Sequence, residues 1–428
     1  MKRIFSLIML TLFFSVLNPG TVFAGTEFIA ELHEPADHDV ISPEDLTEAR
    51  AQVWTEYAEA ELYDGRLLEE TAELSMVFGE ATMRYTVQVI GDKPENGYPL
   101  YIAMHGGGGG DPDVNDEQWE EMQKYYVNEL ECGVYIAVRG VRDTWDIHFN
   151  PESYPLYDRL IRYMILTQDV DPNRVYLEGF SAGGDGVYAI ANRMADRFAA
   201  ANMSSGHPNG ISMRNLYNLP IQLQAGEFDY DYDRHRITAE YGLLLDSLEE
   251  EFGGYIHRTL IHYNEGHNYG DSSSTPIPVM TDIHAWLENN DRSYTDVDSY
   301  PPHFMDPFTR DPLPETVIWD LSTRASSRET QAFYYLTAPF TTDHGIIYTN
   351  FYRETNRITI QTEDVCGEFG ILLNEEMIDF SHPVNITVNR SEFVLDPVPD
   401  RTQLTESTAD RGDPFYQFEA CVTFRPVN

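Results

Sequence analysis

The stretch YLEGFSAGGDGVYAI, residues 176–190, decides the fold of this chain. Its first half is apolar enough for a buried strand, and the residues from Gly184 onward favour a helix. Between them lies the G-x-S-x-G sequence of residues 179–183, in which a sharp strand-to-helix turn lifts a serine oxygen above a sheet. The flanking glycines fit because a side chain at either place would clash with the crowded turn. The pattern predicts Ser181 as a nucleophile, although the motif also arises by chance around a small turn residue.

Short apolar runs alternate with helical stretches on both sides of this motif, which predicts a mostly parallel sheet covered by helices. The predicted strands are residues 83–91, 98–106, 133–140, 174–180, 199–205, 220–226 and 257–263. The predicted helices are residues 115–131, 152–168, 184–197, 235–252 and 278–290.

A serine hydroxyl needs a base, and the base needs an orienting acid. His267 follows the strand at 257–263, and Asp229 follows the strand at 220–226. The order Ser, Asp, His, with each residue just past a strand end, is the one that α/β-hydrolases use. Asp231 and Asp233 stand close by as alternative acids.

A glycine run, MHGGGGGD at residues 104–111, follows the strand at 98–106. Such a run lets backbone N–H groups approach the oxyanion of a tetrahedral intermediate, with the N–H of Ala182 as a second donor. A flexible loop is the structural alternative. A phosphate cradle is excluded because the run lacks the G-K-[ST] ending and carries Asp111 and Asp113.

With these features, residues 75–292 resemble secreted serine esterases of the α/β-hydrolase fold, above all the polyhydroxybutyrate depolymerase and feruloyl or acetylxylan esterase group. The resemblance implies Ser181 as nucleophile, His267 as general base and then acid, and Asp229 as its orienting acid. It also implies an oxyanion hole formed by backbone N–H groups near Gly106, Gly107 and Ala182. One departure is that Ala225-Gly226 stands where this group commonly has His-Gly before the acid.

Two further residues are predicted to contact substrate. Trp145 follows the strand at 133–140, at an edge of the sheet where ligands bind, and could instead be a packing residue. His105 begins the glycine run. His148 is interpreted as a loop histidine rather than a catalyst, because only His267 follows the last predicted strand.

The outer segments differ from this core. Residues 1–24 read as a removed export signal, with a retained membrane anchor as the alternative. Residues 25–74 are predicted as an N-terminal helical extension, and residues 293–315 as a linker rich in Pro, Asp and aromatics. Period-two alternation then predicts a C-terminal all-β module over residues 316–428.

The formal net charge is −43, with 71 acidic residues against 28 Lys and Arg. Such a field repels nucleic acid and anionic membranes, so neither is expected as a partner. After residue 24 only Lys93 and Lys124 remain as lysines, which suggests either adaptation to high salt or an ordinary acidic secreted protein.

The three cysteines do not suggest a metal site, because no Cys/His spacing suits zinc. Cys366 and Cys421 could form a disulfide in an exported chain or remain separate, and Cys132 is predicted as a buried thiol. The acidic run from Asp229 to Glu240 echoes a calcium loop but has Arg234 where glycine is needed. We therefore expect no metal and no cofactor.

The functional prediction is a secreted or periplasmic serine hydrolase that cleaves carboxylic esters, on polysaccharides or in polyesters. Two alternatives stay open. One is a peptidase of the prolyl oligopeptidase type, and the other is a non-catalytic binding protein on a hydrolase scaffold.

Overall fold

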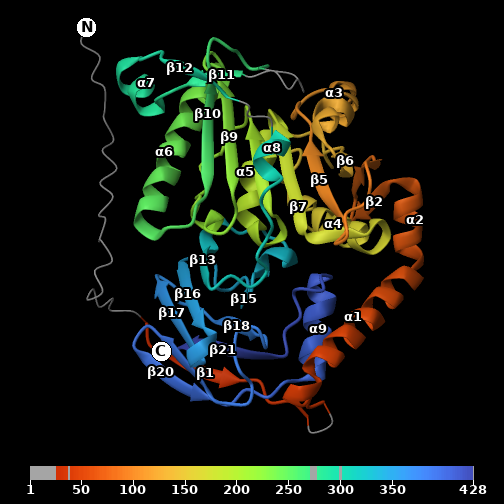
Figure 1. The fold of residues 1–428 in the computed structure, drawn as a ribbon, viewed down its shortest axis with the longest axis vertical. Coiled ribbons are helices and arrows are strands. Elements are labelled where there is room, and N and C mark those ends of the chain that lie inside the picture. The colour runs from red at the N-terminus through yellow and green to blue at the C-terminus, as the bar shows by residue number, and fades with distance from the viewer. Residues whose placement is uncertain (1–25, 37–38, 270–276, 298–300, 428) are drawn as a thin grey trace.

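The computed structural model describes residues 26–36, 39–269, 277–297 and 301–427. The predicted export signal lies outside these ranges. Within them, no helix is long and apolar enough to cross a membrane. The described chain forms an upper α/β domain and a lower C-terminal module (Figure 1).

A nine-stranded sheet forms the centre of the α/β domain, in the order β12-β11-β10-β9-β8-β7-β5-β6-β4. The strands from β6 to β10 across this order are parallel, while β4, β11 and β12 run antiparallel to their neighbours at the two edges. The strands are β4 Gln88–Ile90, β5 Tyr98–Met104, β6 Gly133–Val138, β7 Val170–Phe180, β8 Ala200–Ser204, β9 Ile221–Gly226, β10 His257–His262, β11 Ile277–Met280 and β12 Tyr294–Val297. β6, β8 and β9 are buried along their whole length, as expected of strands covered on both faces.

Helices cover both faces of this sheet because its strands alternate their side chains between them. Leu100, Ile102 and Met104 of β5 share a core with α4 and α5, whereas Tyr101 and Ala103 pack with α3 and α8. The helices are α3 Pro112–Tyr125, α4 Ser153–Gln168, α5 Ala182–Arg193, α6 Arg234–Phe252, α7 Ile283–Asn289 and α8 Pro301–Met305. The predicted helix at 278–290 is thus partly wrong, since β11 occupies its beginning.

The N-terminal segment was predicted as wholly helical, but it begins with β1, Phe28–Leu32, which pairs antiparallel with β21, Ala420–Pro426. The helices α1, Leu46–Tyr63, and α2, Gly65–Glu73, follow. Asp64 separates them, and its carboxylate accepts the N–H of Arg66 as an N-cap. A hairpin of β2 (Ser75–Phe78) and β3 (Ala81–Arg84) leads into the α/β domain.

The C-terminal module consists of two five-stranded sheets, in the orders β1-β21-β18-β15-β14 and β13-β16-β17-β19-β20. Phe393 of β20 contacts Phe424 of β21 between the two sheets, with ring centroids 6.0 Å apart. The remaining strands are β13 Thr316–Asp320, β14 Ala332–Phe333, β15 Leu336–Thr337, β16 Ile346–Tyr352, β17 Arg357–Glu363, β18 Phe369–Leu373, β19 Val384–Val388 and β20 Ser391–Leu395.

Two predictions for these outer segments, and one for Cys132 in the α/β domain, need correction. The module is not all-β, because it contains α9, Arg401–Arg411, a polar helix with few apolar residues to reveal its period. The predicted linker is partly ordered structure, since β12 extends the large sheet and α8 packs on it. Cys366 and Cys421 are separate thiols, and Cys132 is half-buried rather than buried.

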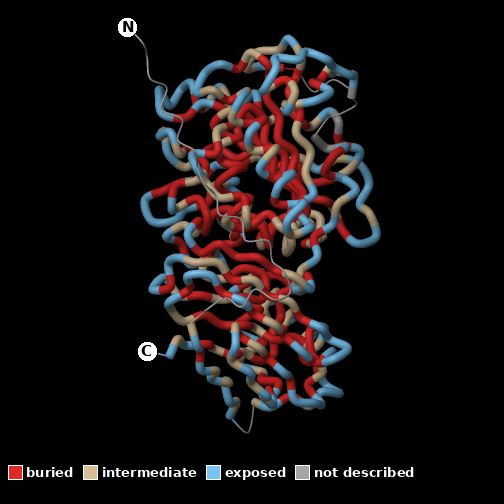
Figure 2. Tube along the Cα trace, turned by 90° about the vertical axis from the view of Figure 1, so that its left-hand side faces the viewer, coloured by how far each residue is buried: buried red, intermediate tan, exposed pale blue. Residues whose placement is uncertain are grey.

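The α/β domain and the module share one continuous hydrophobic core, which includes Leu216 of the domain and Trp319 of the module. Buried residues accordingly run from one part into the other (Figure 2). Beside this core lies a set of buried charges that we call the junction cluster, formed by Asp196, Arg197, Arg310, Arg411 and Asp413.

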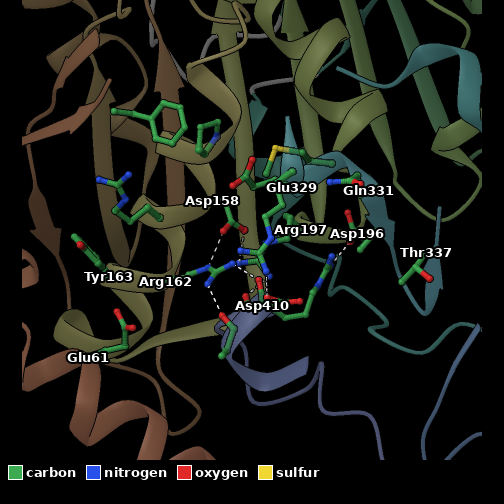
Figure 3. Close-up of a pocket in the computed structure, with 18 of the residues that line it drawn as sticks. Glu61, Asp158, Arg162, Tyr163, Asp196, Arg197, Glu329, Gln331, Thr337 and Asp410 are labelled. Atoms are coloured by element: carbon green, nitrogen blue, oxygen red, sulfur yellow. Dashed lines mark hydrogen bonds and ion pairs between the residues drawn. The ribbon is translucent and has the colours of Figure 1, made fainter. Parts of the chain in front are cut away.

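The junction cluster joins segments that are far apart in the sequence. Arg310 Nη1 lies 2.9 Å from Asp413 Oδ2, and Arg411 pairs with Asp196. Arg197 Nη1 donates to the carbonyl of Arg411 at the end of α9, at 3.1 Å. A cavity of about 560 Å³ lies alongside, where Arg162 and Arg197 reach from the α/β domain toward α9 (Figure 3). These contacts hold the module firmly against the domain.

Candidate active site

Ser181 occupies the sharp turn between β7 and α5. Its backbone has φ 57° and ψ −117°, a conformation that residues other than glycine rarely adopt. A Cβ at Gly179 would lie 2.3 Å from the carbonyl oxygen of Gly183, and a Cβ at Gly183 would lie 2.0 Å from that of Met104. Only glycine fits at both flanking places, which is the steric reason for the G-x-S-x-G pattern.

The structure brings Ser181, His267 and Asp229 together from three strand ends. Ser181 Oγ lies 3.0 Å from His267 Nε2, and His267 Nδ1 lies 2.8 Å from Asp229 Oδ2. Asp229 is 1% exposed, whereas the side chain of His267 is 35% exposed. The imidazole therefore connects a buried carboxylate to a half-buried hydroxyl.

The hydrogen bonds determine the imidazole tautomer. A carboxylate accepts only, so His267 Nδ1 carries the proton that it donates to Asp229. Nε2 is then free to accept the hydroxyl proton of Ser181. This arrangement can remove a proton from Ser181 and later return one to a leaving group.

Of the three candidate acids, only Asp229 contacts His267. Asp231 is exposed, and Asp233 is half-buried and pairs with Arg236 on its own helix. The carbonyl of Asp229 accepts the N–H of His235 at 3.2 Å, which curls the chain back toward the end of β9. The structure therefore distinguishes Asp229 from its neighbours.

The glycine run lies beside Ser181 as predicted. A Cβ at Gly106 would lie 3.3 Å from Ser181 Cβ, so the backbone of this loop faces the nucleophile. The N–H of Gly108 is bound by Asn115 Oδ1 at 2.9 Å. The N–H of Ala182, in the first turn of α5, has no acceptor within the helix and can serve an incoming oxyanion. The backbone of Gly106 and the N-terminus of α5 at Ala182 therefore both lie next to Ser181.

His105 is fully buried, so the prediction that it contacts substrate is wrong. Its Nε2 accepts the N–H of Gly140 at 3.1 Å, and its Nδ1 donates to the carbonyl of Gly106 at 2.5 Å. Burial lowers the pKa of His105 to about 3, so the ring stays neutral. His105 instead links the glycine run to the loop after β6.

Trp145 is 61% exposed and lies next to the glycine run. A Cβ at Gly109 would come within 3.3 Å of the Trp145 amide nitrogen. The indole ring contacts Phe149 edge-on, with centroids 5.2 Å apart. Its exposure leaves one face open beside the proposed oxyanion hole.

Three supporting residues were not predicted from the sequence. Asn115 binds both backbone groups of Gly108, and Ser205 Oγ donates to the carbonyl of His267 at 3.0 Å. Arg234 Nη1 lies 4.0 Å from Asp229 Oδ1. Asn115 and Arg234 act on residues of their own segments but belong to no recognised motif, and Ser205 acts on a residue from a distant segment.

Within the described residues, no group of His, Cys, Asp and Glu is arranged to hold a metal ion. In the calcium-like run, Asp233 and Glu240 instead both form ion pairs with Arg236.

No protein-family model and no curated protein matches the chain. Similar solved structures include a thermostable esterase, with TM-score 0.34 and 23% identity over 44% of this chain and 53% of that one. A carboxylesterase from Bacillus cereus has TM-score 0.33 and 16% identity, over 48% and 92% of the two chains. Est1E from Butyrivibrio proteoclasticus has TM-score 0.32 and 14% identity, over 45% and 89%.

The chain spans about half the length of the first of these structures. Because all three TM-scores are low, the assignment of the fold rests on the structure itself. The helix-covered sheet, the turn at Ser181 and the chain order Ser, Asp, His are those of the α/β-hydrolase fold.

Proposed function

We propose that this protein is a serine hydrolase that cleaves carboxylic esters through an acyl-enzyme on Ser181. The observation that carries the proposal is the continuous hydrogen-bond chain from Ser181 through His267 to buried Asp229, with the glycine run beside the serine. A serine that is only a small turn residue has no need of such partners.

In the first step, Ser181 Oγ attacks the ester carbonyl carbon while His267 Nε2 takes the hydroxyl proton. Negative charge develops on the carbonyl oxygen, where N–H groups near Gly106, Gly107 and Ala182 stabilise it. Collapse of the intermediate breaks the bond to the alcohol oxygen, which takes the proton from His267.

In the second step, water attacks the acyl carbon and gives its proton to His267. The second tetrahedral intermediate releases the carboxylic acid, and His267 returns the proton to Ser181 Oγ. Asp229 stays ionised throughout and stabilises the imidazolium that forms in each step.

We further propose that the protein acts outside the cytoplasm on an ester of a polysaccharide or on a polyester. The sequence of residues 1–24 supports export, and export suits a substrate that is too large to enter a cell. The net charge of −43 makes a polyanionic substrate unfavourable.

The peptidase alternative lacks support from the described chain, where a module of two five-stranded sheets rather than a propeller accompanies the α/β domain. It predicts that a proline-linked amide is cleaved faster than simple esters. The binding-protein alternative predicts that a fluorophosphonate probe leaves the protein unlabelled, because labelling requires an activated serine.

The test is a panel of p-nitrophenyl, feruloyl, acetyl-xylan and polyester substrates, assayed with the wild type and with Ser181→Ala. We expect kcat to fall by about 10⁴- to 10⁶-fold in the variant, since the nucleophile is lost. Thermal unfolding should be nearly unchanged, because alanine keeps the backbone preferences of serine and only the hydroxyl that binds His267 Nε2 is lost. Activity that survives the substitution would refute the proposed mechanism.

A further inference from the structure

A groove of about 330 Å³ runs between the α/β domain and the C-terminal module, next to the proposed active site. Its floor is one face of α5, and its walls come from the loop after β6, the loop after β8 and the first turn of the module. It is lined by Trp145, Phe149, Asp185, Ala189, Arg193, residues 208–212, Ser322 and Thr323.

The groove begins one helical turn from the nucleophile. The N–H of Asp185 donates to the carbonyl of Ser181 at 3.0 Å. Asp185, Ala189 and Arg193 follow at four-residue intervals, so they line one face of α5 over about 12 Å. A substrate whose ester lies at Ser181 can therefore extend along this face toward the module.

The lining combines one exposed aromatic ring with several hydrogen-bonding groups. Trp145 presents an indole face at one side, and Asn209, Ser212 and Ser322 bring amide and hydroxyl groups to the other. Each of them makes a hydrogen bond within the protein: Asn209 Nδ2 donates to the carbonyl of His207, Ser212 Oγ accepts the N–H of Arg214, and Ser322 Oγ donates to Asp320 Oδ1. An apolar chain placed here would bury the hydrogen-bonding capacity that these groups have left, which is costly. A group with an apolar face and hydroxyls at its edges satisfies both kinds of lining.

The two charged residues of the groove are already engaged by protein atoms. Asp185 Oδ1 accepts the N–H of His207 at 2.7 Å. Arg193 Nε donates to the carbonyl of Thr323 at 2.6 Å. Asp185 and Arg193 carry opposite charges on one face of α5, so together they give the groove no net charge, and the overall negative field disfavours an anion.

The module side of the groove is held rigidly. Asn215 Nδ2 donates to Thr323 Oγ1 at 2.9 Å, and Asn215 Oδ1 accepts the N–H of Asp320 at 2.6 Å. All three residues are buried. The end of the groove is therefore a fixed part of the site rather than a surface on a tethered appendage.

We propose that this groove binds the part of the substrate beyond the ester, and that this part is an uncharged, hydroxyl-bearing ring such as a neutral pyranose. The C-terminal module, which forms one side of the groove, thereby sets the specificity for the alcohol of the ester. The proposal rests on the proposed function, since it places the ester at Ser181. In this proposal Trp145 stacks on the ring, and Ser322 of the module closes the far end of the groove.

The test compares esters of one acid, chosen as the acid whose p-nitrophenyl ester is cleaved fastest. The alcohols are methyl glucoside, methyl glucuronoside and cyclohexylmethanol. We expect kcat/KM to be highest for the glucoside ester. Equal or faster cleavage of the cyclohexylmethyl or glucuronoside ester would overturn the proposal.

Trp145→Ala should lower kcat/KM for the glucoside ester by about tenfold, through loss of the aromatic contact. Cleavage of the p-nitrophenyl ester should fall by a smaller factor, because that ester has no sugar ring to stack on Trp145. Tyr63→Ala is the matched control, since Tyr63 is 87% exposed on α1, away from the groove. An equal loss on all esters would show that Trp145 supports catalysis in general and would refute the proposed subsite.

Ser322→Phe tests the module side, because it fills the groove from the module without changing any residue of the α/β domain. It should lower kcat/KM for the glucoside ester while sparing the p-nitrophenyl ester. An unchanged ratio of the two would contradict the role of the module.

A binding measurement separates this proposal from the proposed function. The glucoside ester, titrated into Ser181→Ala, should bind, and the added Trp145→Ala change should weaken that binding about tenfold. If p-nitrophenyl esters are cleaved in a Ser181-dependent way but no glucoside ester binds, only the groove proposal fails. If the glucoside ester binds but no ester is cleaved by the wild type, the proposed function fails instead.

Discussion

Asp229 in the proposed active site and Asp413 in the junction cluster are both buried carboxylates, but their partners differ. Asp229 Oδ2 is bound by His267 at 2.8 Å, and its Oδ1 has no hydrogen bond. Asp413 lies 2.9 Å from Arg310 and 3.7 Å from Arg197, and it also accepts the N–H of Phe415 at 2.9 Å.

The difference lies in what each partner can do with a proton. An imidazole takes and returns protons near neutral pH, whereas a guanidinium stays charged. His267 also reaches a half-buried hydroxyl, while the arginines of the junction cluster contact buried groups of other segments. Asp229 is therefore placed for the proposed catalysis, and Asp413 is placed to hold the module against the α/β domain, although both carboxylates are equally buried.

The largest effect should come from Asp229→Asn. The amide can no longer hold the imidazole in the tautomer and charge state that the reaction needs, so we expect kcat to fall by about 10⁴-fold. The unfolding temperature of this variant should change much less than that of a variant in the junction cluster. A kcat within tenfold of the wild type would mean that another residue orients His267.

Asp413→Asn should have the opposite profile. Removing one partner of a buried ion pair leaves uncompensated charge on Arg310, which typically costs about 3–5 kcal/mol of unfolding free energy. The loss is measured by urea unfolding, with kcat per folded molecule expected to stay close to the wild-type value. If the variant is as stable as the wild type but has lost activity, Asp413 does not act through stability, and the proposed difference between the two carboxylates is wrong.

Acid should act on the active-site region before it acts on the junction. Burial lowers the pKa of His105 from about 6.5 to about 3, so its stabilising effect is complete above pH 6.5 and is lost as the pH falls toward 3. At pH 5 the stabilisation that has been lost amounts to about 2 kcal/mol of unfolding free energy. Burial alone would raise the pKa of Asp413, but Arg310 and Arg197 hold it below its usual value, so the junction weakens only below about pH 4.

Hydrogen exchange measured at pH 7 and pH 5, corrected for intrinsic rates, checks this order. Protection should fall around the glycine run, residues 106–110, and persist in α9. His105→Gln is the control, since an amide can keep both hydrogen bonds but does not titrate. Loss of protection in α9 at pH 5 would contradict the proposed order.

The smallest effect should come from Asp231→Asn. Asp231 is exposed and lies two residues from Asp229, so its carboxylate tests whether proximity in the sequence matters. We expect kcat/KM to stay within about twofold and unfolding free energy within about 0.5 kcal/mol. A large loss of activity would return Asp231 to the group of candidate acids.

Much of the α/β domain could be predicted because its signals are local. The predicted strands at 98–106, 133–140, 199–205, 220–226 and 257–263 each match an observed strand to within two residues. Apolar runs of that length, bounded by glycine and polar turns, have few other ways to bury themselves. The turn at Ser181 is equally local, since glycine is required by atoms within the same few residues and one neighbouring strand.

The errors occurred where distant segments determine the structure. His105 stands in the glycine run and was predicted to contact substrate, yet the loop after β6 covers it completely. The strand β1 was missed because its partner, β21, lies almost 400 residues further along the chain. The helix α9 was missed because few of its residues are apolar, and its buried Ser407 and Thr408 form hydrogen bonds with residues 417–418.

The sequence by itself determined the helix-covered sheet, the turn at Ser181 and the order Ser, Asp, His, because steric and hydrophobic constraints within short segments leave little choice. Only the tertiary structure decided that Asp229 rather than Asp231 faces His267, that His105 is internal, and that the module closes one end of a groove beside Ser181. Those outcomes depend on which surfaces of separate segments pack against each other in one core. The pattern of residues within a single segment does not specify its packing partner.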